Sequence, residues 1–104
     1  IVVMGATASL RGGQGFAAFA QAKAAQRSLA QSMARRLGKE GVHVAYVVID
    51  GAVDQPAMRA RFTDKPDSFF LQPSAIADAV LTLATQDPSA WTFELDLRPS
   101  SEQW

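Results

Sequence analysis

The 104 residues of the chain contain ten basic and ten acidic side chains, and 48% of the residues are apolar. A chain of this length forms at most one domain with a modest core. The balanced charge gives no strong attraction to nucleic acid or to an anionic membrane. The absence of cysteine excludes a disulfide framework and a thiolate metal site. No apolar run reaches the roughly 20 residues of a membrane span, so we expect a cytoplasmic protein that does not enter a membrane.

The first half of the chain predicts a strand, a loop and a long helix. Ile1–Ala6 is a continuous apolar run, typical of a strand buried on both faces of a parallel sheet. It begins without a methionine or a signal peptide, so we expect further residues upstream. A glycine-rich loop follows over Thr7–Gly15. Phe16–Leu37 lacks proline and internal glycine and repeats its small and apolar residues at steps of three and four, which predicts a helix that Gly38 caps.

The next segments predict a second buried strand and an irregular stretch. Val42–Ile49 is apolar except for His43, and a loop follows over Asp50–Pro56. Met58–Pro73 has no regular period and leaves room for only one short helix. A lone histidine inside a strand is more often structural than catalytic, and one histidine without cysteine makes a transition-metal site unfavourable.

The last third predicts a second helix, Ser74–Gln86, and a final strand, Trp91–Leu97. In that strand apolar and polar residues alternate, so Trp91, Phe93, Leu95 and Leu97 should share one face. The fold class is therefore α/β: strands Ile1–Ala6, Val42–Ile49 and Trp91–Leu97 form one parallel sheet, and helices flank it.

A glycine motif before the long helix is similar to a nucleotide-binding turn. Gly13, Gly15 and Ala18 match the G-x-G-x-x-A dinucleotide fingerprint. However, about seven residues separate the preceding strand from Gly13, and the acidic residue expected about 20 positions later is missing. A plain loop leading into a helix is the better interpretation.

The order of these segments resembles the C-terminal half of a short-chain dehydrogenase/reductase. Ile1–Ala6 resembles the strand that ends in the family's serine, and Leu10–Gly12 resembles the loop after it. Phe19–Ala25 resembles the Y-x-x-x-K segment of the long helix. Val42–Val53 resembles the later strand and its Pro-Gly turn, whereas Trp91–Pro99 resembles the closing strand only in position and pattern.

The chain departs from this family at the residues that carry the chemistry. The serine position is Ala6 and the tyrosine position is Phe19, while Lys23 is kept. Asp50 replaces the proline of the Pro-Gly turn, and Gly51 is kept. The threonine expected in the next loop aligns with Gln55. The resemblance implies a cofactor-binding set made of Lys23, Asp50, Gly51, Val53 and Gln55.

The resemblance implies a Rossmann-type domain that binds NAD or NADP, with residues 1–104 as its C-terminal part and the N-terminal cofactor-binding half missing. In the family the tyrosine protonates the developing alkoxide, and loss of such acid–base help costs about 10²–10⁴-fold. Three hypotheses follow. The first is a divergent oxidoreductase with impaired or altered carbonyl/alcohol chemistry on a small molecule. The second is a working oxidoreductase whose proton comes from Asp50, His43 or water, and the third is a non-catalytic nucleotide-binding or oligomerisation partner. Lys23 should point to the carboxyl end of the sheet, near Ala6, Phe19 and Gly51.

Two further expectations concern mobility and assembly. Met58–Leu71 lies where the family carries its substrate lid, and Phe62, Phe69, Phe70 and Leu71 either line a pocket or pack as core. The eight alanines of Phe16–Leu37 either favour the helix or bury a second face. We expect a homodimer or homotetramer that pairs through this helix and through the final strand, which ends near Trp104.

Overall fold

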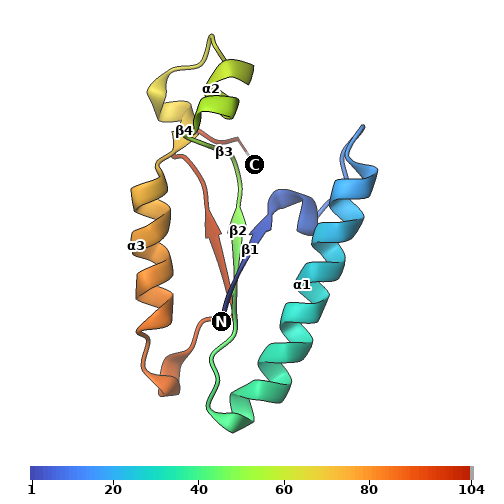
Figure 1. Ribbon diagram of the computed structural model, residues 1–104, viewed down its shortest axis with the longest axis vertical. Coiled ribbons are helices and arrows are strands. Elements are labelled where there is room, and N and C mark those ends of the chain that lie inside the picture. Colours follow the sequence, from blue (N-terminus) through green and yellow to red (C-terminus); the bar gives the residue numbers. More distant parts are fainter. Residues whose placement is uncertain (104) are drawn as a thin grey trace.

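The computed structural model describes residues 1–103 as three layers, with a parallel sheet between two helices (Figure 1). Helix α1 (Ala17–Leu37) covers one face of the sheet, and α3 (Pro73–Ala84) covers the other. Trp104, expected near the second interface, lies outside the described residues. Within residues 1–103, no helix has the length and apolar character required to cross a membrane.

The sheet has three parallel strands in the order β1 (Val2–Ala6), β2 (Ala45–Ile49) and β5 (Glu94–Leu97). Val2 pairs with Ala45 at one end, and Ile49 pairs with Leu97 at the other. Parallel strands place all their carboxyl ends at one edge of the sheet, the edge where ligands bind in open α/β folds. The predicted α/β fold with a parallel sheet flanked by helices is confirmed.

The core has two halves because β2 is buried on both faces. Side chains of alternating residues point to opposite sides of a strand. Toward α1 the buried cluster is Ala30, Tyr46 and Val48, with Val3 and Phe93 packed against it. Toward α3 it is Ala45, Val47 and Leu83, with Val2, Ile49, Leu95 and Leu97 packed against it.

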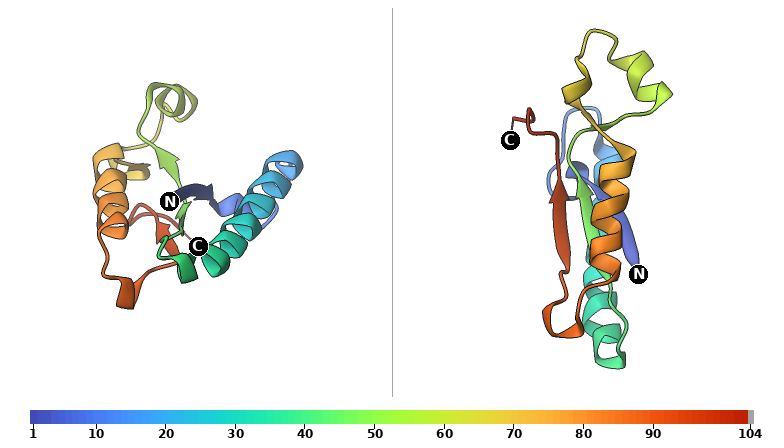
Figure 2. Two further views of the ribbon diagram at one scale, coloured as in Figure 1. Left: turned by 60° about the horizontal axis from the view of Figure 1, so that its bottom comes forward. Right: turned by 90° about the vertical axis from the view of Figure 1, so that its left-hand side faces the viewer.

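Short elements lie beyond the carboxyl edge of the sheet, where Figures 1 and 2 show them projecting away from the three layers. They comprise β3 (Ala52–Val53), α2 (Pro56–Arg61), the 3₁₀ turn η3 (Asp67–Phe69) and β4 (Phe70–Leu71), with β3 and β4 parallel. The predicted irregular stretch thus contains the short helix and also an unpredicted strand pair. Other 3₁₀ turns are η1 (Thr7–Ser9), η2 (Gly38–Glu40) and η4 (Pro88–Ala90).

Both later strands begin three residues after the predicted start, because other partners take their backbone groups. The Val42 amide donates to Leu37 O at the end of α1 (3.1 Å), so β2 begins only at Ala45. The Thr92 amide donates to the side chain of Gln86 (2.9 Å), so β5 begins at Glu94. The predicted single face of the last strand is wrong as well: Phe93 packs on the α1 side, while Leu95 and Leu97 pack on the α3 side.

The helix boundaries also differ in detail from the predictions. Gly38 is the C-cap residue of α1, as predicted, but it keeps a helical φ of −56° and begins η2 rather than ending the helical path. Gly41, with φ of 80°, adopts the left-handed conformation that ends the helical path, which glycine reaches without steric cost. Helix α3 ends at Ala84, two residues before the predicted end.

Candidate functional site

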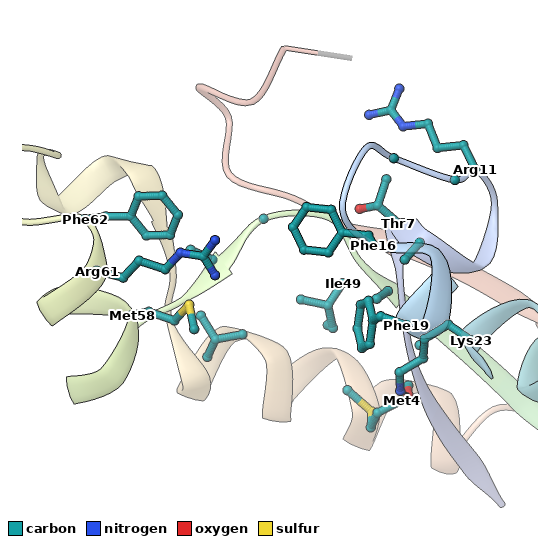
Figure 3. Close-up of a pocket in the computed structure, with 18 of the residues that line it drawn as sticks. Met4, Thr7, Arg11, Phe16, Phe19, Lys23, Ile49, Met58, Arg61 and Phe62 are labelled. Carbon is teal, nitrogen blue, oxygen red and sulfur yellow. Dashed lines mark hydrogen bonds between the residues drawn. The ribbon is translucent and has the colours of Figure 1, made fainter. Parts of the chain in front are cut away.

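A cavity of about 940 Å³, here called the sheet-end cavity, lies at the carboxyl ends of β1 and β2 (Figure 3). The start of α1 and the loop before it form one wall, and the α2 segment forms the other. Its lining is mostly apolar and includes Met4, Ala6, Phe16, Phe19, Ile49, Ala52, Val53, Met58, Phe62 and Phe69.

Lys23 reaches this cavity from the second turn of α1. Its ammonium group donates to Met4 O (3.1 Å) and to Gln26 Oε1 (3.1 Å), and it lies 5.9 Å from the centre of the Phe19 ring. A lysine ammonium has three donors, so two of them hold the group in place and one stays available to a ligand. Lys23 therefore presents an oriented positive charge at the carboxyl edge of the sheet.

The residues at the family's serine and tyrosine positions lie beside Lys23. Ala6 ends β1 and Phe19 stands one helical turn before Lys23; both line the cavity, and Phe19 is 48% exposed. Neither side chain can donate a hydrogen bond. Thr7 carries the one hydroxyl among the lining residues, and this hydroxyl donates to Asp50 Oδ1 at 2.5 Å.

Gly51 also lines the cavity, at a turn that only glycine tolerates. Its φ is 148°, a conformation that residues with a side chain rarely adopt. A Cβ here would lie 2.8 Å from Cδ of Pro99 and 3.1 Å from a methyl carbon of Leu71. The glycine therefore lets the chain that follows β5 pass close to the turn after β2.

Asp50 and Gln55 do not line the cavity, unlike Lys23, Gly51 and Val53. Asp50 is buried beneath the site, where its carboxylate accepts from Thr7 and lies 3.5 Å from Nε of Arg98. Gln55 is exposed at the start of α2 and makes no side-chain capping bond there. The structure thus brings together three of the five predicted cofactor-binding residues.

His43 lies at the opposite end of the sheet from the cavity. It precedes β2, and Ile49 lies six positions further along the chain, about 20 Å away at the usual rise per strand residue. Its ring stacks on Trp91 (4.8 Å between centroids) and contacts Thr92 O (2.8 Å) through Nε2. This position removes His43 from the proton donors available to the cavity and gives it a packing role.

The α2 segment supplies the second wall and is held by one arginine. Arg59 donates to both carboxylate oxygens of Asp54 (2.7 and 2.8 Å) and to Asp67 (2.6 Å), and its guanidinium lies 4.1 Å from the centre of the Phe70 ring. The hydrogen bonds from Arg59, and next the one from Gln72, lower the pKa of Asp54 to about 2. The Asp54 carboxylate in turn raises the pKa of Arg59.

The four apolar residues predicted for the lid divide between wall and core. Phe62 and Phe69 line the cavity, whereas Phe70 and Leu71 are buried and form β4. The mobility predicted for Met58–Leu71 stays a prediction.

The charged residues of the cavity are Arg11, Lys23 and Arg61, and none of the lining residues is acidic. Of these three, the sequence predicts only Lys23 as a site residue. Arg11 lies in a loop and Arg61 in a helix of six residues, so no motif or periodicity marks either of them. Within residues 1–103 no three His, Asp or Glu side chains cluster as metal ligands would.

Comparison with solved structures identifies similar chains. A short-chain dehydrogenase from Rhodopseudomonas palustris is 46% identical over 95% of this chain, with a TM-score of 0.72, and the match covers 37% of that protein. A short-chain oxidoreductase from Pseudomonas aeruginosa, described as containing an atypical catalytic centre, is 20% identical over the whole chain, with a TM-score of 0.81, and the match covers 47% of that protein. This second likeness shows the fold alone. No family model matches the chain, and no curated protein does.

The present chain therefore spans less than half the length of either solved structure. The sequence identity, the parallel sheet with its flanking helices, and the lysine at the carboxyl edge of the sheet agree with one another. The chain belongs to the short-chain dehydrogenase/reductase family.

Proposed function

We propose that this chain is the C-terminal part of an NAD- or NADP-dependent oxidoreductase that keeps the family's nucleotide-binding lysine but lacks its usual proton donor. One observation carries the proposal. Lys23 and Phe19 lie one helical turn apart and face the same cavity at the carboxyl edge of the sheet. The positive charge is in place, and the hydroxyl that should stand beside it is absent.

The cavity fits a nicotinamide nucleotide in size and charge. About 940 Å³ is within the range of cofactor and small-molecule sites. The third donor of the Lys23 ammonium can bind a ribose hydroxyl, and the lining has no carboxylate to repel phosphate. The nicotinamide would supply or accept a hydride.

The remaining residues explain why the ordinary reaction should be slow. Neither Ala6 nor Phe19 can protonate or hydrogen-bond an oxygen on which negative charge develops. The Thr7 hydroxyl is directed to Asp50, and the Asp50 carboxylate does not line the cavity. An alcohol or carbonyl substrate would therefore depend on water for its proton.

The edges of the sheet support a longer parent protein. Within the described residues, β1 and β5 each pair only with β2, so the outer edge of β1, the first strand in the chain, has no partner strand. Such an edge is normally paired or covered in a folded protein. We therefore assign the missing N-terminal half of the Rossmann-type domain to this side of β1.

The test for nucleotide binding uses the full-length protein and titrates NADH and NADPH by fluorescence. Lys23→Ala should weaken nucleotide binding about tenfold or more, because a charge-assisted hydrogen bond is lost. Lys39→Ala is the matched control, since Lys39 is exposed in η2, at the far end of α1. Unchanged affinity in Lys23→Ala, or no binding by the unmodified protein, would contradict the proposal.

The test for the lost proton donor is Phe19→Tyr. It should raise the rate of carbonyl reduction by about 10²–10⁴-fold while nucleotide affinity changes little. Phe16→Tyr is the control, because Phe16 lines the same cavity and is equally exposed (49% against 48%) but lies a turn further from Lys23. Equal rates in the two variants would show that position 19 is not the proton-donor position.

A second candidate role, as a partner in a homodimer or homotetramer, rests on the outer face of α1. Only Ala20 and Ala30 of this helix are buried, whereas Leu29 is 60% exposed. A leucine this exposed beside several alanines suits helix-to-helix contact. Leu29→Glu should reduce the mass of the full-length protein in sedimentation, and an unchanged mass would remove α1 from the interface.

A further inference from the structure

The pairing of the arginines divides them into two groups. Four arginines form ion pairs with carboxylates: Arg27, Arg36, Arg59 and Arg98. Among residues 1–103, Arg11, Arg35 and Arg61 have no carboxylate partner. Arg35 is exposed near the end of α1, but Arg11 and Arg61 both line the sheet-end cavity. The unpaired guanidinium groups are thus concentrated at one site.

Arg61 is placed to receive a ligand rather than to stabilise the fold. It ends α2, and its side chain extends across the cavity toward Phe16 (Figure 3). Its guanidinium carbon lies 5.5 Å from the centre of the Phe62 ring, and Met58 lies beside it in the same wall. A guanidinium against an aromatic ring keeps its donors free for planar, bidentate binding of a carboxylate.

The position of Arg61 separates it from the nucleotide. Lys23, which the proposed function assigns to the ribose, stands on the α1 wall, and Arg61 stands on the α2 wall across the cavity. The side chains around Arg61 are apolar, chiefly Met58, Phe16 and Phe62. This wall suits a ligand with an apolar body and a single negative end.

We propose that the substrate of this site is a carboxylate with an aliphatic or aromatic body, whose carboxylate binds Arg61 while its apolar part lies against Phe62 and Phe16. Arg11, on the rim formed by the loop after β1, adds positive potential at the entrance. This inference rests on the proposed oxidoreductase function for the carbonyl or alcohol that reacts, but the recognition of the charge depends only on the cavity.

The experiment compares 4-benzoylbutyrate with its methyl ester, which has the same benzoylpropyl body but carries a methyl group in place of the negative charge. Binding to the full-length protein is measured by calorimetry, with and without saturating NADP⁺. The acid should bind about tenfold or more tightly than the ester, and Arg61→Gln should remove that preference. Arg11→Gln should reduce it by a smaller factor. Arg35→Gln, which changes an unpaired arginine outside the cavity, should leave it intact.

The outcomes distinguish this inference from the proposed function. If the protein binds neither nucleotide but prefers the acid, and Arg61→Gln removes the preference, the substrate assignment stands and the oxidoreductase proposal fails. If nucleotide binds but acid and ester bind equally, or neither binds in the millimolar range, the inference is overturned. It is also overturned if Arg61→Gln weakens NADPH as strongly as the acid, because Arg61 would then serve the nucleotide phosphates.

Discussion

Gly5 in the middle of β1 offers the sharpest test of the packing. A Cβ added to Gly5 would lie 2.3 Å from Cε1 and Cζ of the Tyr46 ring and 2.4 Å from its hydroxyl oxygen. Cβ atoms in proteins do not approach other heavy atoms this closely, so the Tyr46 ring or the strand must move. Tyr46 has no exposed surface, and its ring packs in the core between β2 and α1. The ring therefore has no space in solvent to occupy.

The magnitude of the Gly5→Ala effect follows from two opposed contributions. Overpacking a well-filled core typically costs about 1–3 kcal/mol, and the extent of this clash places it at the upper end. Replacing glycine in a strand returns about 0.5–1 kcal/mol of backbone entropy. We expect a net loss of about 2 kcal/mol in the free energy of unfolding.

Urea denaturation of the full-length protein, followed by far-UV circular dichroism, measures this loss. Gly12→Ala is the matched control, because a Cβ there meets no atom within 4 Å and the backbone has no positive φ. It should change stability by no more than about 0.5 kcal/mol. Gly5 also lies between Met4 and Ala6, which line the cavity, so Gly5→Ala should weaken nucleotide binding as well. Equal stabilities of the two variants would refute the packing described for Tyr46.

Two further predictions concern ion pairs of different exposure. Arg27→Ala should destabilise the protein by about 1 kcal/mol in urea denaturation, because Arg27 bridges α1 to Glu94 of β5 through two nitrogens and both partners are only about 30% exposed. Arg36→Ala should cost less than half of that, because the pair of Arg36 lies on the helix surface and is far more exposed. Equal losses in the two variants would contradict this ranking. The ion pair between Asp54 and Arg59 should break in acid. Folding lowers the pKa of Asp54 from 3.8 to about 2, so the contribution of the pair to stability is complete above pH 4 and is lost as the pH falls toward 2. Pepsin cleavage within residues 56–71 should therefore rise across this interval, and the rise should be absent in Asp54→Asn, which lacks the titrating group; parallel profiles for both proteins would count against it.

The main elements were predictable because their patterns are long or continuous. The apolar runs around Val3 and Val47 and the helical period over 22 residues need no tertiary information. The strand starts were wrong because they depend on single hydrogen bonds, such as the one from the Thr92 amide to Gln86, that no periodicity encodes. Strands of two residues, such as β3 and β4, are too short to show the alternation of apolar and polar residues that predicts a strand.

The site was predictable only where the family motif marks it. Lys23, Ala6 and Phe19 could be located because they occupy the family's lysine, serine and tyrosine positions. Arg61 was not, because its role depends on how α2 is turned toward the sheet. Asp50 was placed at the right turn but on the wrong side of it, since burial directs its carboxylate beneath the cavity to Thr7.

The contacts of Asp50 have a consequence for how the cavity can adapt. Thr7 follows β1, Asp50 follows β2 and Arg98 follows β5, so side chains cross-link the ends of all three strands beneath the site. The floor is thereby a fixed frame that cannot widen at one strand without breaking these links. The α2 wall is joined to this floor through the short β3–β4 pair and through the ion pair of Arg59 with Asp54. New ligand shapes should therefore arise by substitutions in residues 56–69, while the nucleotide side keeps its geometry.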